Sequence, residues 1–240
     1  MPLPAGVSEV AVGRKREEGR VHVFYLHGFA SSPQSSKAAF FSVRLAERGV
    51  SMQCPDFNQP DFAGLTVSRM LQQLEKRITS LPPGDVVLIG SSLGGLIAVE
   101  AAAREVSRAR HPISRVVLLA PAVELEWERW TELGSSGIPG WRANREIEVF
   151  HYAYDEPRLL HFGFYEDASR YHADGRRLVQ PLLIFQGRQD ESVSPAVVEK
   201  FARAQPASTL HMLDDGHQLK NSLDFIWDQT AQFLGERFPL

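Results

Sequence analysis

The sequence has a single cysteine, Cys54, among its 240 residues. An internal disulfide is therefore excluded, and so is a metal cluster held by several thiolates. Cys54 lies in a short apolar segment, which predicts a small, buried, unreactive residue. The chain also lacks any apolar run near the roughly 20 residues that a membrane-spanning helix needs. No basic region followed by an apolar run occurs near the start, so we expect no secretory signal and a cytoplasmic protein.

A strong charge of one sign is also absent. The formal net charge is −3, from 26 basic and 29 acidic residues. The basic run at residues 14–16 is followed at once by two glutamates. We therefore expect no nucleic-acid surface. Apolar residues make up 43% of the chain and charged residues 23%, which predicts a folded protein with an ample core.

Strand-like and helix-like segments alternate along most of the chain. Short apolar runs predict strands, and apolar residues at helical spacing predict helices. The expected strands are residues 21–26, 50–54, 86–89, 116–119, 182–185 and 209–213, and the expected helices are residues 36–48, 67–78, 96–106 and 223–234. This alternation predicts an α/β fold, with a mostly parallel central sheet and helices on both of its faces.

Residues 121–177 interrupt the alternation. The segment holds three of the four tryptophans and four of the five tyrosines of the chain: Trp127, Trp130, Trp141, Tyr152, Tyr154, Tyr165 and Tyr171. Apolar residues alternate around 147–151 and 160–164, with a turn signal at 155–157 between them, which predicts a β-hairpin flanked by helical pieces. We interpret residues 1–240 as one domain that carries an inserted, aromatic-rich cap at about 121–177.

A strand, a tight turn and a helix surround the sequence Gly90-Ser91-Ser92-Leu93-Gly94. Glycines on both sides of a serine let the chain turn sharply and expose the hydroxyl group, as in the nucleophile elbow of α/β-hydrolases. The spacing selects Ser92, because Gly90 and Gly94 lie two residues away on either side. Ser91 has Ile89 at the corresponding position.

A serine hydroxyl needs a base to take its proton and an acid to orient that base. In the α/β-hydrolase order, the acid and then the histidine follow the nucleophile, each after a late strand. Asp190 follows the expected strand 182–185, and His217 follows the strand 209–213. We predict Ser92, Asp190 and His217 as the catalytic triad.

Other residues compete for these two roles. Glu191 is the neighbour of Asp190, but the pattern Gly-x-x-Asp-x-x-Val at residues 187–193 favours Asp190. Asp214 and Asp215 are close to the histidine in sequence, and we expect them to shape its turn. His211 lies inside a strand, which places it on a sheet face and away from the carboxyl edge.

Acyl transfer also needs hydrogen-bond donors for the oxyanion of the tetrahedral intermediate. We predict that the backbone N–H groups of Phe29 and Leu93 form this oxyanion hole, with Ala30 as the alternative to Phe29. His27 precedes this early loop, and we interpret it as a structural residue.

The stretch from Tyr25 to Ala38, the tripeptide at 55–57 and the glycine-rich turn at 90–95 resemble the small bacterial YqiA-type esterases of the α/β-hydrolase superfamily. The resemblance implies a serine hydrolase of short-chain esters or thioesters. The insertion at 121–177 is larger than those compact esterases carry. It would roof the pocket, either to bind an apolar or aromatic acyl group or to hold a small subdomain on the core.

We predict no metal site and no cofactor. His151, His161 and His172 recur at roughly ten-residue spacing, which matches no usual ligand pattern. The expected function is hydrolysis of a small-molecule carboxylic ester through an acyl-enzyme. Acyl thioesterase and amidase activities by the same mechanism are the alternatives, together with a non-enzymatic receptor that keeps the fold. The sequence leaves the oligomeric state open.

Overall fold

The computed structural model describes residues 20–104 and 110–235. Within them, six strands form a parallel sheet in the order β2-β1-β3-β4-β7-β8. The strands are β1 (Val21–Leu26), β2 (Met52–Gln53), β3 (Asp85–Ser91), β4 (Ile113–Leu119), β7 (Leu182–Gly187) and β8 (Ser208–Leu213). The predicted parallel sheet is confirmed, and its carboxyl edge collects the loops that follow all six strands.

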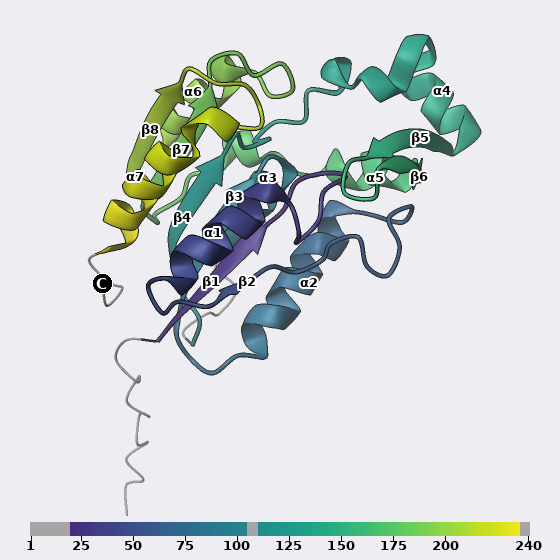
Figure 1. Cartoon of the computed structure of the whole chain (residues 1–240). Helices are drawn as coiled ribbons and strands as arrows, with labels where there is room; N and C mark the ends of the chain where they lie inside the picture. The colour runs from purple at the N-terminus through teal and green to yellow at the C-terminus, as the bar shows by residue number, and fades with distance from the viewer. Residues whose placement is uncertain (1–19, 105–109, 236–240) are drawn as a thin grey trace, which may run out of the picture.

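Helices cover both faces of the sheet (Figure 1). Helices α1 (Ser36–Ala46) and α7 (Leu223–Gly235) lie on one face, and α2 (Val67–Thr79), α3 (Leu93–Ala103) and α6 (Pro195–Ala204) lie on the other. Alternation along the strands supplies both layers. In β1, Val23 and Tyr25 pack in the layer of α1 and α7. Phe24 and Leu26 pack in the layer of α2, α3 and α6.

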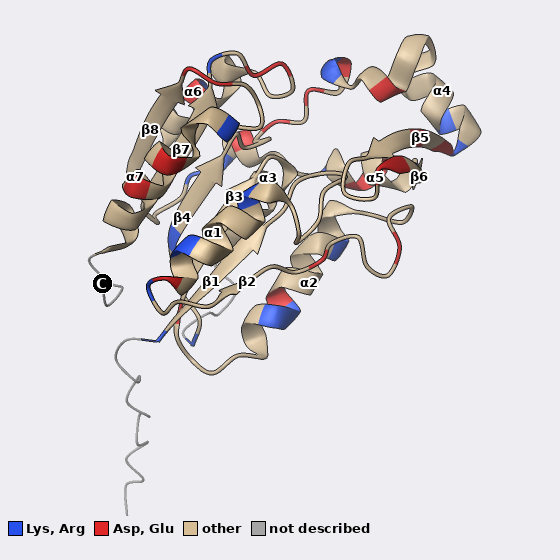
Figure 2. Ribbon diagram, viewed as in Figure 1, with Lys and Arg blue, Asp and Glu red and all other residues tan. Residues whose placement is uncertain are grey.

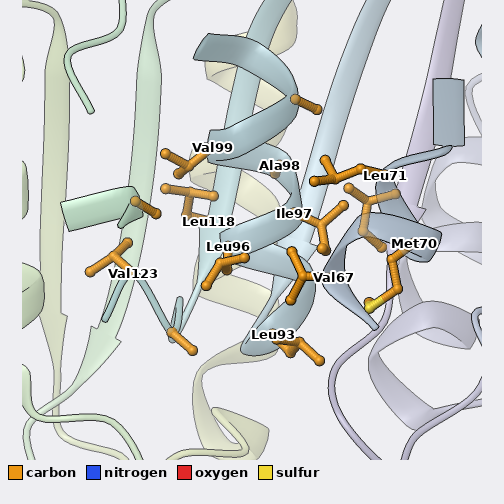
Figure 3. Packing of buried hydrophobic residues seen from close by; sticks show 14 of the residues in the cluster. Val67, Met70, Leu71, Leu93, Leu96, Ile97, Ala98, Val99, Leu118 and Val123 are labelled. Carbon is orange, nitrogen blue, oxygen red and sulfur yellow. The ribbon is translucent and has the colours of Figure 1, made fainter. Parts of the chain in front are cut away.

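The helix that follows the serine turn is buried along ten of its 11 residues. Figure 3 shows its side chains between those of α2 and Leu118 of β4. Leu96, Ile97 and Val99 have no solvent exposure, and burial of each such side chain stabilises the fold by about 1.5–3 kcal/mol. The helix predicted at residues 96–106 begins three residues after the observed start of α3 at Leu93. The predicted end at Val106 lies outside the described residues.

The second expected strand is much shorter than predicted. Residues 50–54 were expected to form it, but β2 comprises only Met52–Gln53. This strand lies at the edge of the sheet and pairs with β1 alone. An edge strand that is so short presents few unpaired backbone groups.

The insertion between β4 and β7 contains η1 (Trp127–Arg129), η2 (Thr131–Ser136), α4 (Gly137–Asn144), β5 (Glu146–His151), β6 (Glu156–His161), α5 (Gly163–Ala168) and η3 (Ala173–Gly175). It lies near the carboxyl edge of the sheet (Figure 1). The antiparallel hairpin β5–β6 and its helical flanks confirm the prediction. Two details were wrong: Pro157 lies in β6 rather than in the turn, and Phe164 lies in α5 rather than in a strand.

Polar contacts fasten the insertion to the core. Arg176 donates two hydrogen bonds of 3.0 Å to the carboxylate of Glu100 in α3, a side chain with no solvent exposure. Ser68 of α2 donates from its hydroxyl group to Asp167 of α5 at 2.6 Å, and from its backbone N–H to the same carboxylate at 2.8 Å. A buried carboxylate needs such partners, so these contacts fix where the insertion lies.

Acidic and basic residues are interspersed over the fold (Figure 2), in keeping with the small net charge. Among the described residues, no helix is both long enough and apolar enough to cross a membrane. The basic run at 14–16 lies outside the part of the chain that the structure describes.

Candidate active site

The serine turn joins β3 directly to α3. Ser92 is the single residue between them, and its φ is +52°, a left-handed value that costs a non-glycine residue about 1–3 kcal/mol. The turn requires glycine at both flanking positions, because neighbouring backbone atoms leave no room there for a side chain. A Cβ at Gly94 would lie 2.0 Å from the carbonyl oxygen of Leu26, and one at Gly90 would lie 2.4 Å from that of Gly94.

The fit at Gly94 gives a stability prediction. Replacing Gly94 by alanine is expected to lower the free energy of unfolding by about 3 kcal/mol or more, because a backbone oxygen must move. Urea unfolding measures the change. Gly163→Ala is the matched control, since nothing lies within 4 Å of the Cβ that it would add. Equal stability of the two variants would contradict the packing argument.

The structure brings Ser92, His217 and Asp190 together from three separate loops. Nε2 of His217 lies 3.1 Å from the hydroxyl oxygen of Ser92. Nδ1 lies 2.9 Å from Oδ2 of Asp190 and 3.1 Å from its Oδ1. An ionised carboxylate can only accept hydrogen bonds, so Nδ1–H of His217 donates to Asp190. Nε2 therefore carries no proton and is free to accept the one from the serine hydroxyl group. This is the connected proton path that a serine nucleophile needs.

Asp190 is held by several donors besides His217. The backbone N–H groups of Ser192 and Val193 donate to its Oδ1, and the side-chain amide of Gln186 donates to Oδ2 at 2.8 Å. Burial, the largest single influence, opposes ionisation. The hydrogen bond and charge of His217, with the bonds from Val193 and Gln186, outweigh it, so the pKa of Asp190 is lowered. The carboxylate is therefore ionised and fixed in direction.

The competing residues lie elsewhere. Glu191 is exposed, and its carbonyl oxygen accepts from Arg129. Asp214 accepts from Gln189. Asp215 accepts from the backbone N–H groups of Gly216 and Asn221, which confirms that it shapes the turn before His217.

The remaining histidine of this region is in the sheet. His211 lies in β8 and stacks on Phe185 at 5.3 Å between ring centroids, as its position in a strand predicted. It is therefore separated from the serine turn.

The expected oxyanion donors lie on the two loops next to Ser92. Leu93 is the first residue of α3, so its N–H has no acceptor within the helix. On the other loop, a Cβ added to Gly28 would lie 3.2 Å from the Cβ of Ser92, so the loop closely approaches the serine. Phe29 follows, and its N–H has no acceptor among the described residues. Ala30, the alternative donor, has a left-handed φ of +49°.

His27 is buried, with 2% of its surface exposed. The backbone N–H of Phe57 donates to its Nε2 at 3.0 Å, so Nδ1 carries the proton and donates to the carbonyl oxygen of Gly28 at 2.9 Å. Burial is the main reason that the pKa of His27 is lowered. Both ring nitrogens are thus occupied, which fits the structural role expected for this residue.

Three buried or half-buried histidines with lowered pKa values predict a pH-dependent stability. Burial lowers the pKa of His27, His151 and His211 from the ordinary value of 6.5. Below pH 6.5 the unfolded chain therefore binds more protons than the folded chain. The free energy of unfolding then decreases as the pH is lowered. Each group contributes a slope of up to about 1.4 kcal/mol per pH unit until its folded pKa is reached. Urea unfolding between pH 7 and 5 measures it.

The control for this prediction removes one titrating ring away from the serine. His211→Leu places an apolar side chain against Phe185. It should lower the slope of the unfolding free energy against pH by the contribution of one histidine. A slope that is the same in the variant and in the parent would show that His211 does not titrate differently in the folded state.

The other single residues of interest behave as follows. Cys54 is half-buried and follows β2, and burial raises the pKa of its thiol to about 12, so it is an inert residue. Among the described residues, no group of three or more histidine, cysteine or acidic side chains is placed to hold a metal ion. His151, one of the three spaced histidines, is fully buried in the hairpin.

Partly exposed aromatic rings continue from Phe29 into the insertion. Ring centroids are 5.0 Å apart for Phe29 and Trp130, 4.8 Å for Trp130 and Trp127, and 4.9 Å for Trp127 and Tyr165. All four side chains are half-buried. We call these four residues the aromatic strip. Buried rings behind it pack the insertion on the core, namely Phe62, Trp141, Phe162 and Phe164.

Comparisons with known proteins match this architecture. The family model described as "Uncharacterised protein family (UPF0227)" matches residues 22–234. A presumed hydrolase from Agrobacterium vitis S4 is 23% identical over 90% of each chain, with a TM-score of 0.78. Est1E from Butyrivibrio proteoclasticus, solved with ferulic acid bound, is 21% identical over 94% of this chain and 92% of its own, with a TM-score of 0.74. At these identities the likeness shows the α/β-hydrolase fold.

One curated protein is also similar in sequence. The AMB antimetabolite synthetase AmbE of Pseudomonas aeruginosa is 31% identical over 165 residues, which is 64% of this chain. The matched chain spans 8% of the length of that relative. The similarity is therefore to one small part of a much larger protein.

Proposed function

The chain belongs to the uncharacterised protein family UPF0227, as its resemblance to the YqiA-type proteins predicts, and we propose that it is a serine hydrolase of carboxylic esters. The observation that carries this proposal is the path from Ser92 through His217 to Asp190, with contacts of 3.1 and 2.9 Å. Hydrolases and esterases with the same fold support it.

The proposed reaction has two steps. Oγ of Ser92 attacks the ester carbonyl carbon while Nε2 of His217 takes the serine proton. The N–H groups of Phe29 and Leu93 donate to the oxyanion of the tetrahedral intermediate. His217 then passes the proton to the leaving alkoxide, and the C–O bond breaks to give an alcohol and the acyl-enzyme. In the second step, water attacks the acyl group, His217 takes a proton from that water, and a carboxylic acid leaves as Ser92 is reprotonated.

The aromatic strip favours an apolar acyl group. Its rings begin at Phe29, in the loop that approaches Ser92, and each is partly open to solvent. Partly exposed aromatic side chains bury large apolar areas when a ligand covers them. Est1E is a neighbour of the same fold with ferulic acid bound, and an aromatic acid of that kind would suit such a strip here. Thioesters use the same steps and are the second candidate, since a thiolate leaves without much help from His217.

Labelling with a fluorophosphonate probe tests the chemistry directly. The probe reacts with an activated serine, so we expect labelling of the parent protein and none of Ser92→Ala. A series of p-nitrophenyl esters and acyl thioesters of increasing chain length, with an aromatic ester included, then compares the leaving groups and the acyl groups. A folded protein that is not labelled would overturn the hydrolase proposal and favour a ligand-binding receptor of the same fold.

A further inference from the structure

One side chain determines the direction of the proposed oxyanion donor. The carbonyl group of Gly28 and the N–H of Phe29 belong to the same planar peptide unit, so they point in opposite directions. Nδ1–H of His27 donates to that carbonyl oxygen at 2.9 Å. The ring is itself fixed, because Phe57 N–H donates to its Nε2 at 3.0 Å. The direction of Phe29 N–H is thus set by a buried imidazole.

A second side chain holds the far end of the same loop. The amide nitrogen of Asn58 donates to the carbonyl oxygen of Ser31 at 2.8 Å and to Oδ1 of Asp56 at 2.9 Å. Asn58 is 4% exposed. Between the two anchors lies Ala30, whose left-handed φ of +49° persists only in a well-determined environment. The loop at 28–31 is therefore fastened at both ends.

The anchor at Asn58 is completed by the insertion. Since the amide nitrogen of Asn58 is used by two acceptors, its Oδ1 faces His151 and accepts from Nε2–H at 3.1 Å. His151 has no solvent exposure. Its ring stacks on Tyr154 at 4.0 Å and meets the edge of Phe62 at 4.7 Å. The hairpin β5–β6 therefore reaches the oxyanion loop through one buried hydrogen bond.

We propose that His27 and Asn58 are positioning residues of the oxyanion hole, and that His151 makes the geometry of the hole depend on docking of the insertion. This inference rests on the proposed function, because it gives Phe29 N–H a role in that reaction. An oxyanion donor acts on the transition state and hardly on the bound substrate, so misplacing it lowers kcat more than it changes KM. A purely structural contact would have no such selectivity.

Substitutions at His151 test the link to the insertion. His151→Phe keeps a ring between Tyr154 and Phe62 but removes the donor to Asn58. We expect kcat for p-nitrophenyl acetate to fall about tenfold with KM within about twofold. The affinity for an alkylboronic acid, whose tetrahedral adduct mimics the intermediate, should fall by a similar factor. His151→Gln, which offers an N–H to the same acceptor, should recover most of both.

A matched control loosens the insertion at another point. Ser68→Ala removes the hydroxyl contacts with Asp167 and Tyr171, which join the core to the insertion without touching the oxyanion loop, and keeps the backbone hydrogen bond to Asp167. We expect its kcat and boronic acid affinity to stay within about twofold of the parent. If Ser68→Ala loses as much as His151→Phe, docking in general is what matters and the specific link is overturned. An unchanged His151→Phe overturns it as well.

Two further measurements keep the test decisive. Asn58→Leu breaks the same link from the core side, and circular dichroism with thermal unfolding shows which variants are folded at the assay temperature.

Ser92→Ala separates this inference from the proposed function. If that variant retains full turnover, the serine mechanism itself is wrong. If turnover is lost in Ser92→Ala but unchanged in His151→Phe and Asn58→Leu, only the coupling is refuted.

Discussion

Replacing Ser92 by alanine is expected to lower kcat for ester hydrolysis by about 10⁴-fold or more. The change removes the attacking oxygen and leaves only whatever acceleration the oxyanion donors and substrate binding provide. The burst of p-nitrophenol that marks acyl-enzyme formation should disappear entirely. Stopped-flow release of p-nitrophenol from an activated ester measures both quantities. Substrate affinity should change little, because the hydroxyl group acts mainly in the transition state.

Ser91→Ala is the matched control for this experiment. Ser91 ends β3 one residue earlier, and its buried side chain interacts with Tyr25 of β1. We expect this variant to keep both the burst and most of the turnover. Loss of the burst in Ser91→Ala, with retention in Ser92→Ala, would show that Ser91 is the nucleophile and that the assignment of Ser92 is wrong.

Replacing Asp190 by asparagine is expected to lower kcat by about 10⁴-fold without unfolding the protein. The N–H groups of Ser192 and Val193 hold the Oδ1 position, at 2.9 and 2.8 Å. The new amide nitrogen must then take the Oδ2 position, which faces Nδ1 of His217. It donates to Nδ1, so the imidazole proton moves to Nε2. That nitrogen can no longer accept the proton of the serine.

The neighbour of the substituted carboxylate helps the variant to fold. Gln186 donates to Oδ2 at present, and its own Oε1 is buried without a hydrogen-bond partner among the described residues. Rotating that amide would let Oε1 accept from the new asparagine. Asp214→Asn is the matched control, since it removes a charge from the loop before His217, where the Asp214 carboxylate accepts from Gln189 rather than from His217. Equal losses in kcat for the two variants would rule out the tautomer explanation.

The proximity of Ser92, Asp190 and His217 could be predicted because topology constrains it strongly. In a parallel sheet, the loop after each strand lies at the same edge, so a serine, an aspartate and a histidine after β3, β7 and β8 must be near one another. The glycine pattern fixed which serine turns outward. Both inferences need only local sequence and strand order, and the observed contacts of 2.9 and 3.1 Å agree with them.

The contacts of the insertion could not be predicted in the same way. Asn58 and His151 are 93 residues apart and belong to a loop and a hairpin whose relative placement no repeat or spacing specifies. The spacing of His151, His161 and His172 was weighed only for metal binding, so its real contact was missed. Gln186 gave a clearer signal. A lone amide at the end of an apolar strand, four residues before the acid, could have been assigned to hold that acid.

The end of β6 shows how a correct burial pattern can accompany the wrong conformation. Leu160, Phe162 and Phe164 alternate in sequence as in a strand, and all three are buried. The chain instead leaves β6 at His161 and enters α5 at Gly163. Phe162 N–H donates to the carbonyl oxygen of Arg145, beyond the start of β5, which ends the ladder. A helix start and a strand can place alternate residues on the same side for a few positions.

The strand order has a consequence for how the protein is made. From β3 onward, each strand of the large sheet pairs with one that the ribosome has already synthesised, and the sheet widens outward through β4 and β7 to β8. Domains tend to form from the N-terminal side during translation. His217, the proposed base, follows β8, the outermost of these strands. Under the proposed mechanism, a growing chain would therefore carry a folded but unreactive Ser92, which becomes reactive only when the last strand of the sheet and His217 have been synthesised.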